Sequence, residues 1–258
     1  MSLPVGIQLF SLRERMEKDP RSTLRMLAKI GYEGVETYSG AGSLDAEEFR
    51  KLCDSLGLII ISAHVSYGMM SNHTAEQLRL YKKLGAEYIA YPYMDDDSVR
   101  PGGEKYGEVV ENMRRIAIDA KASGIQMLYH NHDFEFEKLD GQYKLDYQYG
   151  LFSPDELQAE LDVCWIKHVG EDPVEYIKKY SGRCPCLHMK DFVEKNDGSG
   201  AVEMRPVGYG CQDVPTILKT ATDCGVKWII VEQDHSSMGL SDIECADKSL
   251  RYLRSFKW

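Results

Sequence analysis

The sequence predicts a closed (β/α)8 barrel. Along the 258 residues, short β-branched and aromatic runs alternate eight times with segments whose apolar residues recur at helical spacing. Strands separated by helices form parallel βαβ units, and eight such units in about 250 residues match the size of a closed barrel. A doubly wound sheet is the main alternative, but no Gly-x-Gly-x-x-Gly motif follows the first predicted strand.

Proline and glycine mark most of the predicted element boundaries. The first predicted helix opens at Asp19-Pro20 and stops at Gly31, as expected for an N-terminal cap and a C-terminal glycine. Four later helices stop before Gly57, Gly85, Gly124 and Gly225. The predicted strands cover residues 5–10, 34–37, 58–64, 88–93, 127–132, 158–165, 184–190 and 228–233. The predicted helices cover residues 19–30, 45–56, 75–84, 106–123, 173–180, 213–224 and 242–256.

Two segments interrupt this alternation. Residues 134–145 hold Asp140-Gly141 between short apolar-polar runs, which predicts a β-hairpin. Residues 194–205 form a polar insertion that contains Asn-Asp-Gly-Ser-Gly. We expect both segments near the mouth of the barrel, within a single domain that covers residues 1–258.

The composition is ordinary for a globular protein and argues against two classes of partner. Hydrophobic residues make up 43% of the chain and charged residues 28%. No apolar run approaches the roughly eighteen residues of a membrane span, so we expect no membrane partner. The net charge of −10 repels a phosphate backbone, so we expect no nucleic-acid partner.

The cysteines and the start of the chain bear on localisation. Several of the seven cysteines lie inside apolar runs, which predicts reduced, buried thiols. The first strand begins at residue 5, so there is no signal peptide unless a leader has been removed. We therefore expect a cytoplasmic protein.

Polar side chains gather where the predicted strands end. Residues 127–132 begin apolar and end with His130 and His132, which share one face because side chains of a strand alternate. Barrel active sites form at the carboxyl ends of the strands. The polar residues at these ends are Gln8, Glu36, His64, His130, His132, Asp162, His188, Lys190, Glu232 and Asp234.

Asp162, His188 and Glu232 come from the last three strands, which are neighbours in a barrel. A single histidine or carboxylate at a strand end is more often a hydrogen-bonded structural group than a ligand. Together, however, the buried charges outnumber the nearby bases and need a cation. An oxygen-rich donor set with imidazole suits Mn²⁺, Mg²⁺ or Co²⁺.

Five motifs resemble those of a known family. The chain is similar to the sugar phosphate isomerase/epimerase family, the xylose isomerase-like TIM barrels that include endonuclease IV and inosose dehydratase. The motifs are Tyr-His-Asn-His-Asp-Phe-Glu-Phe (129–136), Leu-Asp-Val-Cys-Trp (161–165), Leu-His-Met-Lys-Asp (187–191), Pro-Val-Gly-Tyr-Gly (206–210) and Val-Glu-Gln-Asp (231–234). The resemblance covers nearly the whole chain.

The resemblance implies one divalent metal ion, with Mn²⁺ expected and Mg²⁺, Co²⁺ or Zn²⁺ as alternatives. Asp162, His188 and Glu232 take the places of three ligands. Many relatives carry a glutamate where this chain has His130. We expect Glu135 to supply the missing ligand, with His130 as the competing candidate.

The resemblance also implies roles for other residues. His132 matches an acid/base position of related dehydratases, although it could equally orient a ligand. Glu232 and Glu135 are further candidate bases. Lys190 would stabilise an enolate oxygen or pair with Asp162. The expected substrate-binding residues are Gln8, Glu36, His64, His130 and Trp165, and Tyr93 is a second candidate for stacking against a sugar.

We therefore expect an isomerase or epimerase of a keto sugar, sugar phosphate or polyol ketone that removes a proton to give a metal-bound enediolate. A dehydratase or lyase shares this first step. A sugar-binding barrel without turnover is the alternative from another class, and an endonuclease IV-type phosphodiesterase is the least favoured. Barrels of this family often form dimers or tetramers, which allows a homo-oligomer.

Overall fold

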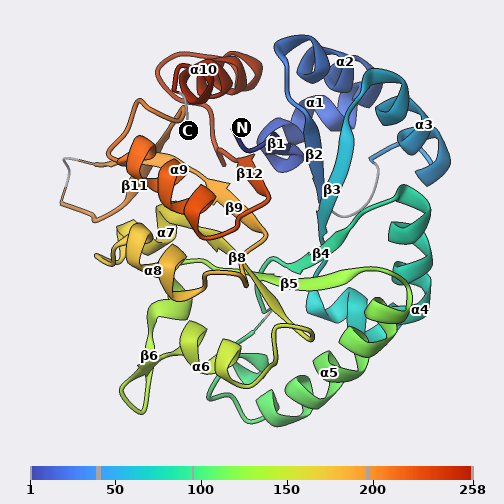
Figure 1. The fold of residues 1–258 in the computed structure, drawn as a ribbon, viewed down its shortest axis with the longest axis vertical. Coiled ribbons are helices and arrows are strands. Elements are labelled where there is room, and N and C mark those ends of the chain that lie inside the picture. Colours follow the sequence, from blue (N-terminus) through green and yellow to red (C-terminus); the bar gives the residue numbers. More distant parts are fainter. Residues whose placement is uncertain (1, 39–41, 95, 196–197, 257–258) are drawn as a thin grey trace.

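The computed structural model describes residues 2–38, 42–94, 96–195 and 198–256. Within these residues, eight parallel strands close into a barrel that is surrounded by helices (Figure 1). The strand order is β1-β12-β9-β8-β5-β4-β3-β2, and the first and last of these pair with each other. The barrel strands are β1 (Val5–Gln8), β2 (Gly34–Tyr38), β3 (Ile59–His64), β4 (Tyr88–Tyr91), β5 (Gln126–His130), β8 (Gln158–Asp162), β9 (Cys186–Met189) and β12 (Trp228–Val231). The predicted (β/α)8 barrel is confirmed.

The helices run around the outside of the barrel, clockwise in Figure 1 from α2 to α10. They are α1 (Arg13–Lys18), α2 (Pro20–Ile30), α3 (Ala46–Leu56), α4 (Tyr67–Leu84), α5 (Tyr106–Ala122), α6 (Lys144–Gly150), α7 (Val163–His168), α8 (Pro173–Lys179), α9 (Val214–Asp223) and α10 (Asp242–Arg254). Helix α2 has the predicted ends: the Asp19 side chain accepts a hydrogen bond from the Ser22 amide, and Gly31 has a φ of 110°.

Two glycines on neighbouring strands make room for one isoleucine inside the barrel. Gly6 of β1 and Gly34 of β2 pair in register. A Cβ atom on Gly34 would lie 2.8 Å from Ile61, and one on Gly6 would overlap Cδ1 of the same side chain. Ile61 is buried in an apolar layer with Tyr88, Ala90, Leu128, Cys186, Trp228 and Ile230.

This apolar layer supports the polar strand ends. Because side chains two residues apart share a face of a strand, His130 follows Leu128 toward the carboxyl end of β5. His188 follows Cys186 on β9 in the same way. On β5 and β9, the side chains that face the barrel interior therefore change from apolar to ionisable within two residues.

Several predicted boundaries were wrong. The predicted strand over residues 158–165 ends at Asp162, because the Asp162 side chain accepts a hydrogen bond from the Cys164 amide and caps α7. Trp165 is therefore a helical residue. The helix predicted over residues 75–84 begins at Tyr67 and carries a kink at His73. Helices α1 and α6 were not predicted.

Both interruptions contain hairpins. Strands β6 (Lys138–Leu139) and β7 (Gln142–Tyr143) pair across Asp140-Gly141, as predicted. Strands β10 (Asp191–Glu194) and β11 (Val202–Arg205) pair antiparallel, and β11 forms the end of the second insertion. Residues 196–197 of that insertion lie outside the described residues. The single-domain organisation stays a prediction, and none of the described helices is both long and apolar enough to cross a membrane.

Candidate active site

A cavity of about 500 Å³ lies at the carboxyl ends of the barrel strands. Histidine and acidic side chains from the strand ends share its wall with aromatic side chains. The lining residues are Phe10, Tyr38, His64, Ser66, Pro92, Tyr93, His130, His132, Trp165, Lys190, Glu232, Asp234 and His235. The cavity thus collects many of the residues predicted from the strand ends.

Two overlapping sets of potential metal ligands converge here among the described residues. The set that we call the mouth group consists of His130, Asp162, His188 and Glu232. The set that we call the deep group consists of His64, His130, Glu160 and His188. In each set the donor atoms lie within 4.8 Å of one another. Glu160 precedes Asp162 by two residues on β8, which places the deep group one layer further into the barrel.

His188 connects the two layers. Its Nδ1 atom lies 2.9 Å from Oε2 of Glu232, and its Nε2 atom lies 2.7 Å from Oε1 of Glu36. All three residues are buried. Although burial acts to lower the pKa of His188, the Glu36 and Glu160 carboxylates raise it well above its ordinary value.

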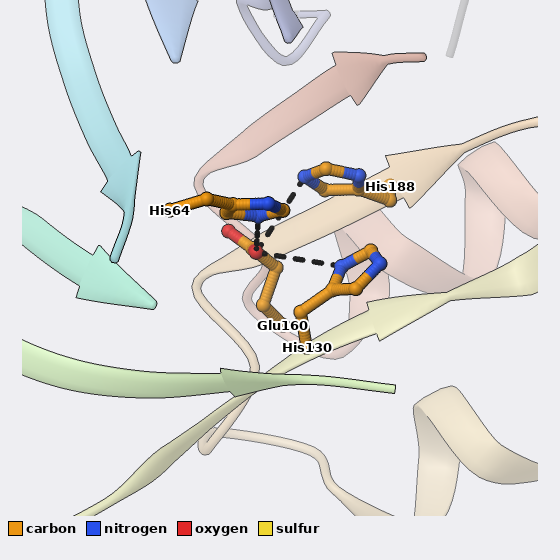
Figure 2. Close-up of side chains that lie close together, drawn as sticks. All are labelled: His64, His130, Glu160 and His188. Atoms are coloured by element: carbon orange, nitrogen blue, oxygen red, sulfur yellow. Dashed lines mark hydrogen bonds and ion pairs between the residues drawn. The ribbon is translucent and has the colours of Figure 1, made fainter. Parts of the chain in front are cut away.

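Glu160 lies at the centre of the deep group (Figure 2). Its Oε2 atom is 2.7 Å from Nε2 of His64, 3.5 Å from Nδ1 of His130 and 3.5 Å from Nε2 of His188. The other oxygen, Oε1, is buried without a hydrogen bond. Burial and then the neighbouring Glu36 raise the pKa of Glu160 to about 7.

Lys190 supplies the positive charge of the outer layer. Its ammonium lies 2.9 Å from Glu232, 3.1 Å from Asp234 and 3.3 Å from Asp162. The side chain is almost fully buried, and these carboxylates raise its pKa well above the ordinary value despite the opposing effect of burial. Lys190 therefore carries a positive charge. The contact with Asp162 is one of its two predicted roles, and the stabilisation of an enolate oxygen stays a prediction.

His130 is buried but forms no hydrogen bond through Nδ1. Its Nε2 atom lies 3.7 Å from Oδ2 of Asp162, which is also buried without a hydrogen bond. Burial and then the neighbouring His188 hold the pKa of His130 well below its ordinary value, so the ring is neutral. A neutral imidazole beside a buried carboxylate is a donor set that fits a divalent ion.

The structure places Glu135 apart from both ligand groups. Glu135 lies in the short 3-10 turn η3 (Phe134–Phe136), and its carboxylate belongs to neither group. One oxygen accepts a hydrogen bond from the Tyr129 hydroxyl at 2.6 Å, and the other accepts one from the His132 amide at 2.7 Å. Of the two candidates for the ligand on β5, His130 joins the group and Glu135 does not.

His132 follows the end of β5 and lines the cavity. Its ring stacks on Phe134 with a centroid distance of 5.5 Å and lies 5.7 Å from the Trp165 ring. Burial and then the charge of Lys190 lower the pKa of His132 to about 3. The imidazole is therefore neutral at neutral pH.

The predicted substrate-binding residues separate into two sets. His64, His130 and Trp165 line the cavity, as does Tyr93. Gln8 and Glu36 are instead fully buried, and the Gln8 amide donates a hydrogen bond of 2.7 Å to Glu36. Side-chain alternation correctly predicts that Gln8 and Glu36 face the barrel interior, but both residues lie one layer below the mouth.

Glu160 was not among the predicted site residues. The signal was present, because Glu160 and Asp162 are two residues apart on one strand and must share a face.

Comparisons with known proteins agree with this geometry. The xylose isomerase-like TIM barrel family matches residues 24–256. An inosose dehydratase of Clostridium beijerinckii is 23% identical over 171 residues, which are 58% of this chain and 54% of the relative. The chain thus spans about half the length of that relative. An inosose dehydratase of Mesomycoplasma hyopneumoniae is 22% identical over 274 positions, covering 97% of this chain and 84% of the relative.

Solved structures show the same fold at low identity. A sugar phosphate isomerase/epimerase from Parabacteroides distasonis superposes with a TM-score of 0.83 at 24% identity, covering 99% of this chain and 94% of that chain. An L-ribulose 3-epimerase superposes with a TM-score of 0.73 at 15% identity, again covering 99% and 94%. The closed barrel, the ionisable strand ends and the match over most of the chain together show that this protein belongs to the xylose isomerase-like TIM barrel family.

Proposed function

We propose that the protein is a divalent-metal-dependent enzyme that isomerises or epimerises a keto sugar, a sugar phosphate or a polyol ketone. One observation carries the proposal: the mouth group brings two carboxylates and two imidazoles together at the carboxyl ends of the strands. Asp162, His188 and Glu232 would hold the ion, with Mn²⁺ expected and Mg²⁺, Co²⁺ or Zn²⁺ as alternatives. When bound, the ion supplies a Lewis acid that polarises the substrate carbonyl.

In this proposal His132 moves the proton. Its Nδ1 atom is buried, so Nε2 is the nitrogen that meets the cavity. The ring is unprotonated at neutral pH, so it has a lone pair that can accept a proton from the carbon beside the carbonyl. Glu232 suits this role less well, because its carboxylate already contacts the Lys190 ammonium and Nδ1 of His188, each at 2.9 Å. Glu135 already accepts two hydrogen bonds.

Lys190 and the aromatic wall serve the substrate. The Lys190 ammonium lies between Asp162 and Glu232 and 5.6 Å from the centre of the Trp165 ring. A substrate stacked on Trp165 would bring its developing enolate oxygen toward this fixed positive charge, which stabilises the negative charge of the transition state. Tyr93 is 44% exposed and offers a second apolar face at the same cavity.

Proton exchange tests the proposal. The metal-loaded protein is incubated with a panel of keto sugars in deuterated water, and deuterium beside the carbonyl is followed by NMR. We expect exchange that chelation abolishes and that His132→Gln slows by about 100-fold or more. His73→Gln is the matched control, because His73 lies on the outer helix α4. Metal-loaded protein that binds a sugar of the panel but exchanges no proton would instead be a sugar-binding barrel without turnover.

A dehydratase or lyase reaction is the second candidate. The inosose dehydratases among the relatives favour it, at 22–23% identity. Both reactions begin with the same proton transfer, so the exchange experiment does not separate them. Loss of water or of a β-substituent, measured as a change in product mass, would assign the protein to this second class.

A further inference from the structure

The mouth and deep groups share two histidines, and each shared ring faces both groups with different nitrogens. His188 has Nδ1 2.9 Å from Glu232 of the mouth group, and Nε2 3.5 Å from Glu160 of the deep group and 2.7 Å from the adjacent Glu36. His130 points Nε2 toward Asp162 and Nδ1 toward Glu160. A neutral imidazole has one nitrogen lone pair free for a metal ion. Each ring can therefore serve one group as a ligand and the other only as a hydrogen-bond donor.

The two groups also differ in their permanent charge. The mouth carboxylates contact the Lys190 ammonium. Glu36 and Glu160 are fully buried, and their ion pairs among the described residues are all with histidines. A buried carboxylate without a lasting positive partner is costly. The deep group and Glu36, which together we call the deep layer, thus contain no lysine or arginine, and histidine imidazoles are the only ion-pair partners of their two carboxylates among the described residues.

The deep layer contains potential ligand atoms that form no hydrogen bonds, which suits the binding of a metal ion. Oε2 of Glu36, Oε1 of Glu160 and Nδ1 of His130 are buried and form no hydrogen bonds. Nε2 of His64 lies 2.7 Å from Glu160 and 3.2 Å from Glu36. Ligand atoms bound at about 2.1 Å around one ion lie about 3 to 3.5 Å from each other. Two of the printed separations fall in this range, at 3.2 Å between His64 and Glu36 and 3.5 Å between His130 and Glu160, and the His64–Glu160 pair is closer at 2.7 Å.

We propose that the deep layer is a second divalent-cation site, held by His64 Nε2, His130 Nδ1, Glu160 and Glu36. His188 then serves the mouth as a ligand through Nδ1 and donates its Nε2 hydrogen to Glu36. A divalent ion neutralises the two deep carboxylates. The mouth ion keeps three protein ligands with positions open for substrate, whereas the deep site is a closed set of four, as in structural sites.

The chemistry of the donors selects the class of metal. Two imidazoles and two carboxylates suit Zn²⁺, Co²⁺ or Mn²⁺ better than Ca²⁺. The four residues come from β2, β3, β5 and β8, so that the ion joins strands that are not all neighbours in the barrel. Because Glu36, His130 and Glu160 are at most 1% exposed, this ion would hold the barrel interior together, and His64 and His130 are the ligands that also line the cavity.

Metal counting tests the second site. Chelator-treated protein is loaded with Zn²⁺, desalted, and its ions are counted by native mass spectrometry and elemental analysis. We expect two ions per chain in the wild type and one in Glu160→Gln. Asp162→Asn at the mouth should also keep one, and the double variant none. His73→Gln is a control for zinc on an exposed histidine and should keep two. A Glu160→Gln protein that retains the wild-type count overturns the proposal, and Glu160 then only orients His130.

A second measurement needs no variant. Anomalous diffraction at the zinc edge from zinc-loaded crystals should give a peak among His64, His130 and Glu160, separate from a peak at Asp162. A single peak at Asp162 overturns the deep site. The inference shares the mouth ion with the proposed function, but the two can fail separately. A protein that binds two ions but exchanges no proton would contradict only the proposed function. A protein that exchanges protons with a single ion at the mouth would contradict only the deep site.

Discussion

The ammonium of Lys190 lies 2.9 Å from Oε2 of Glu232, and both side chains are almost fully buried. The lysine follows β9 and the glutamate follows β12, which are paired neighbours in the barrel. The contact gives the mouth group a positive charge that does not depend on a bound ion. It also prevents Glu232 from accepting a proton easily, because the ion pair favours the carboxylate form.

Replacing Lys190 by methionine should destabilise the metal-free protein. The substitution keeps an unbranched side chain but leaves Asp162 and Glu232 buried without their cation. Removing one partner of a buried ion pair typically costs about 3 to 5 kcal/mol. We expect a loss of about 3 kcal/mol in urea unfolding, because Asp234, the third partner, is partly exposed and relaxes toward solvent.

Lys219→Met is the matched control. Lys219 pairs with Asp223 on the exposed face of α9, so its loss should leave the unfolding midpoint unchanged. Equal stability of Lys190→Met and wild type would show that the mouth carboxylates are not held as anions.

Glu135 should make the stability depend on pH. Burial raises its pKa from 4.5 to about 7. The folded protein therefore binds this proton more tightly than the unfolded chain does. Its contribution is fully present below pH 4.5 and is lost as the pH rises to about 7. The pKa difference corresponds to about 3 kcal/mol across this window.

Glu135→Gln imitates the protonated form and should remove this part of the pH dependence. Urea unfolding at pH 5 and pH 8 measures it: the wild type should lose more stability between the two than the variant does. Glu137→Gln changes an exposed glutamate two residues away and should keep the wild-type slope. If the stability of Glu135→Gln changes with pH as much as that of the wild type, Glu135 is already ionised in the folded protein.

Much of this site could be predicted from strand ends alone. The alternation of side chains along a strand identifies which residues face the barrel interior, and it placed His130, Asp162, His188 and Glu232 together. Alternation does not give depth, because depth depends on how neighbouring strands are staggered. Gln8 and Glu36 therefore seemed to belong to the substrate rim, and Glu160 was missed.

Glu135 could not be placed because it follows the end of a strand. The direction of its side chain depends on the 3-10 turn over Phe134–Phe136 and on the buried Tyr129 hydroxyl that donates to it. Neither the turn nor this hydrogen bond follows from the periodic pattern of apolar residues in the sequence. His132, Lys190 and Glu232 lie only one or two residues past their strands and could still be predicted, whereas Glu135, five residues past β5, could not.

Metal binding should stabilise the fold. A ligand present at 100 times its dissociation constant, bound only by the folded state, stabilises that state by about 2.7 kcal/mol. We expect the unfolding temperature of chelated protein to rise with added Mn²⁺ or Zn²⁺, and to rise less in Glu232→Gln, which weakens the mouth group. An unfolding temperature that does not respond to either metal would contradict metal binding at both groups.

The packing of Ile61 between two strands predicts a destabilised barrel in Gly6→Ala. The new methyl group would overlap Cδ1 of Ile61, and overpacked cores lose about 1 to 3 kcal/mol. Ile61→Val removes that δ-carbon, so the double variant should recover part of the loss, because the next atom near the methyl group is a Gly34 carbonyl oxygen 3.3 Å away. Urea unfolding of the two single variants and the double variant gives the coupling between the sites.

The control is a glycine with free space around it. Gly107 lies in α5, and no atom lies within 4 Å of the position that its Cβ would occupy, so Gly107→Ala should stabilise the helix by up to about 1 kcal/mol. If Gly6→Ala lowers the free energy of unfolding and Gly107→Ala raises it, the loss at Gly6 comes from packing against Ile61. Helix or strand propensity alone favours alanine at both positions. Additive effects of Gly6→Ala and Ile61→Val would instead mean that the methyl group is accommodated elsewhere. In that case the apolar layer beneath His130 and His188 is looser than the packing of Ile61 requires.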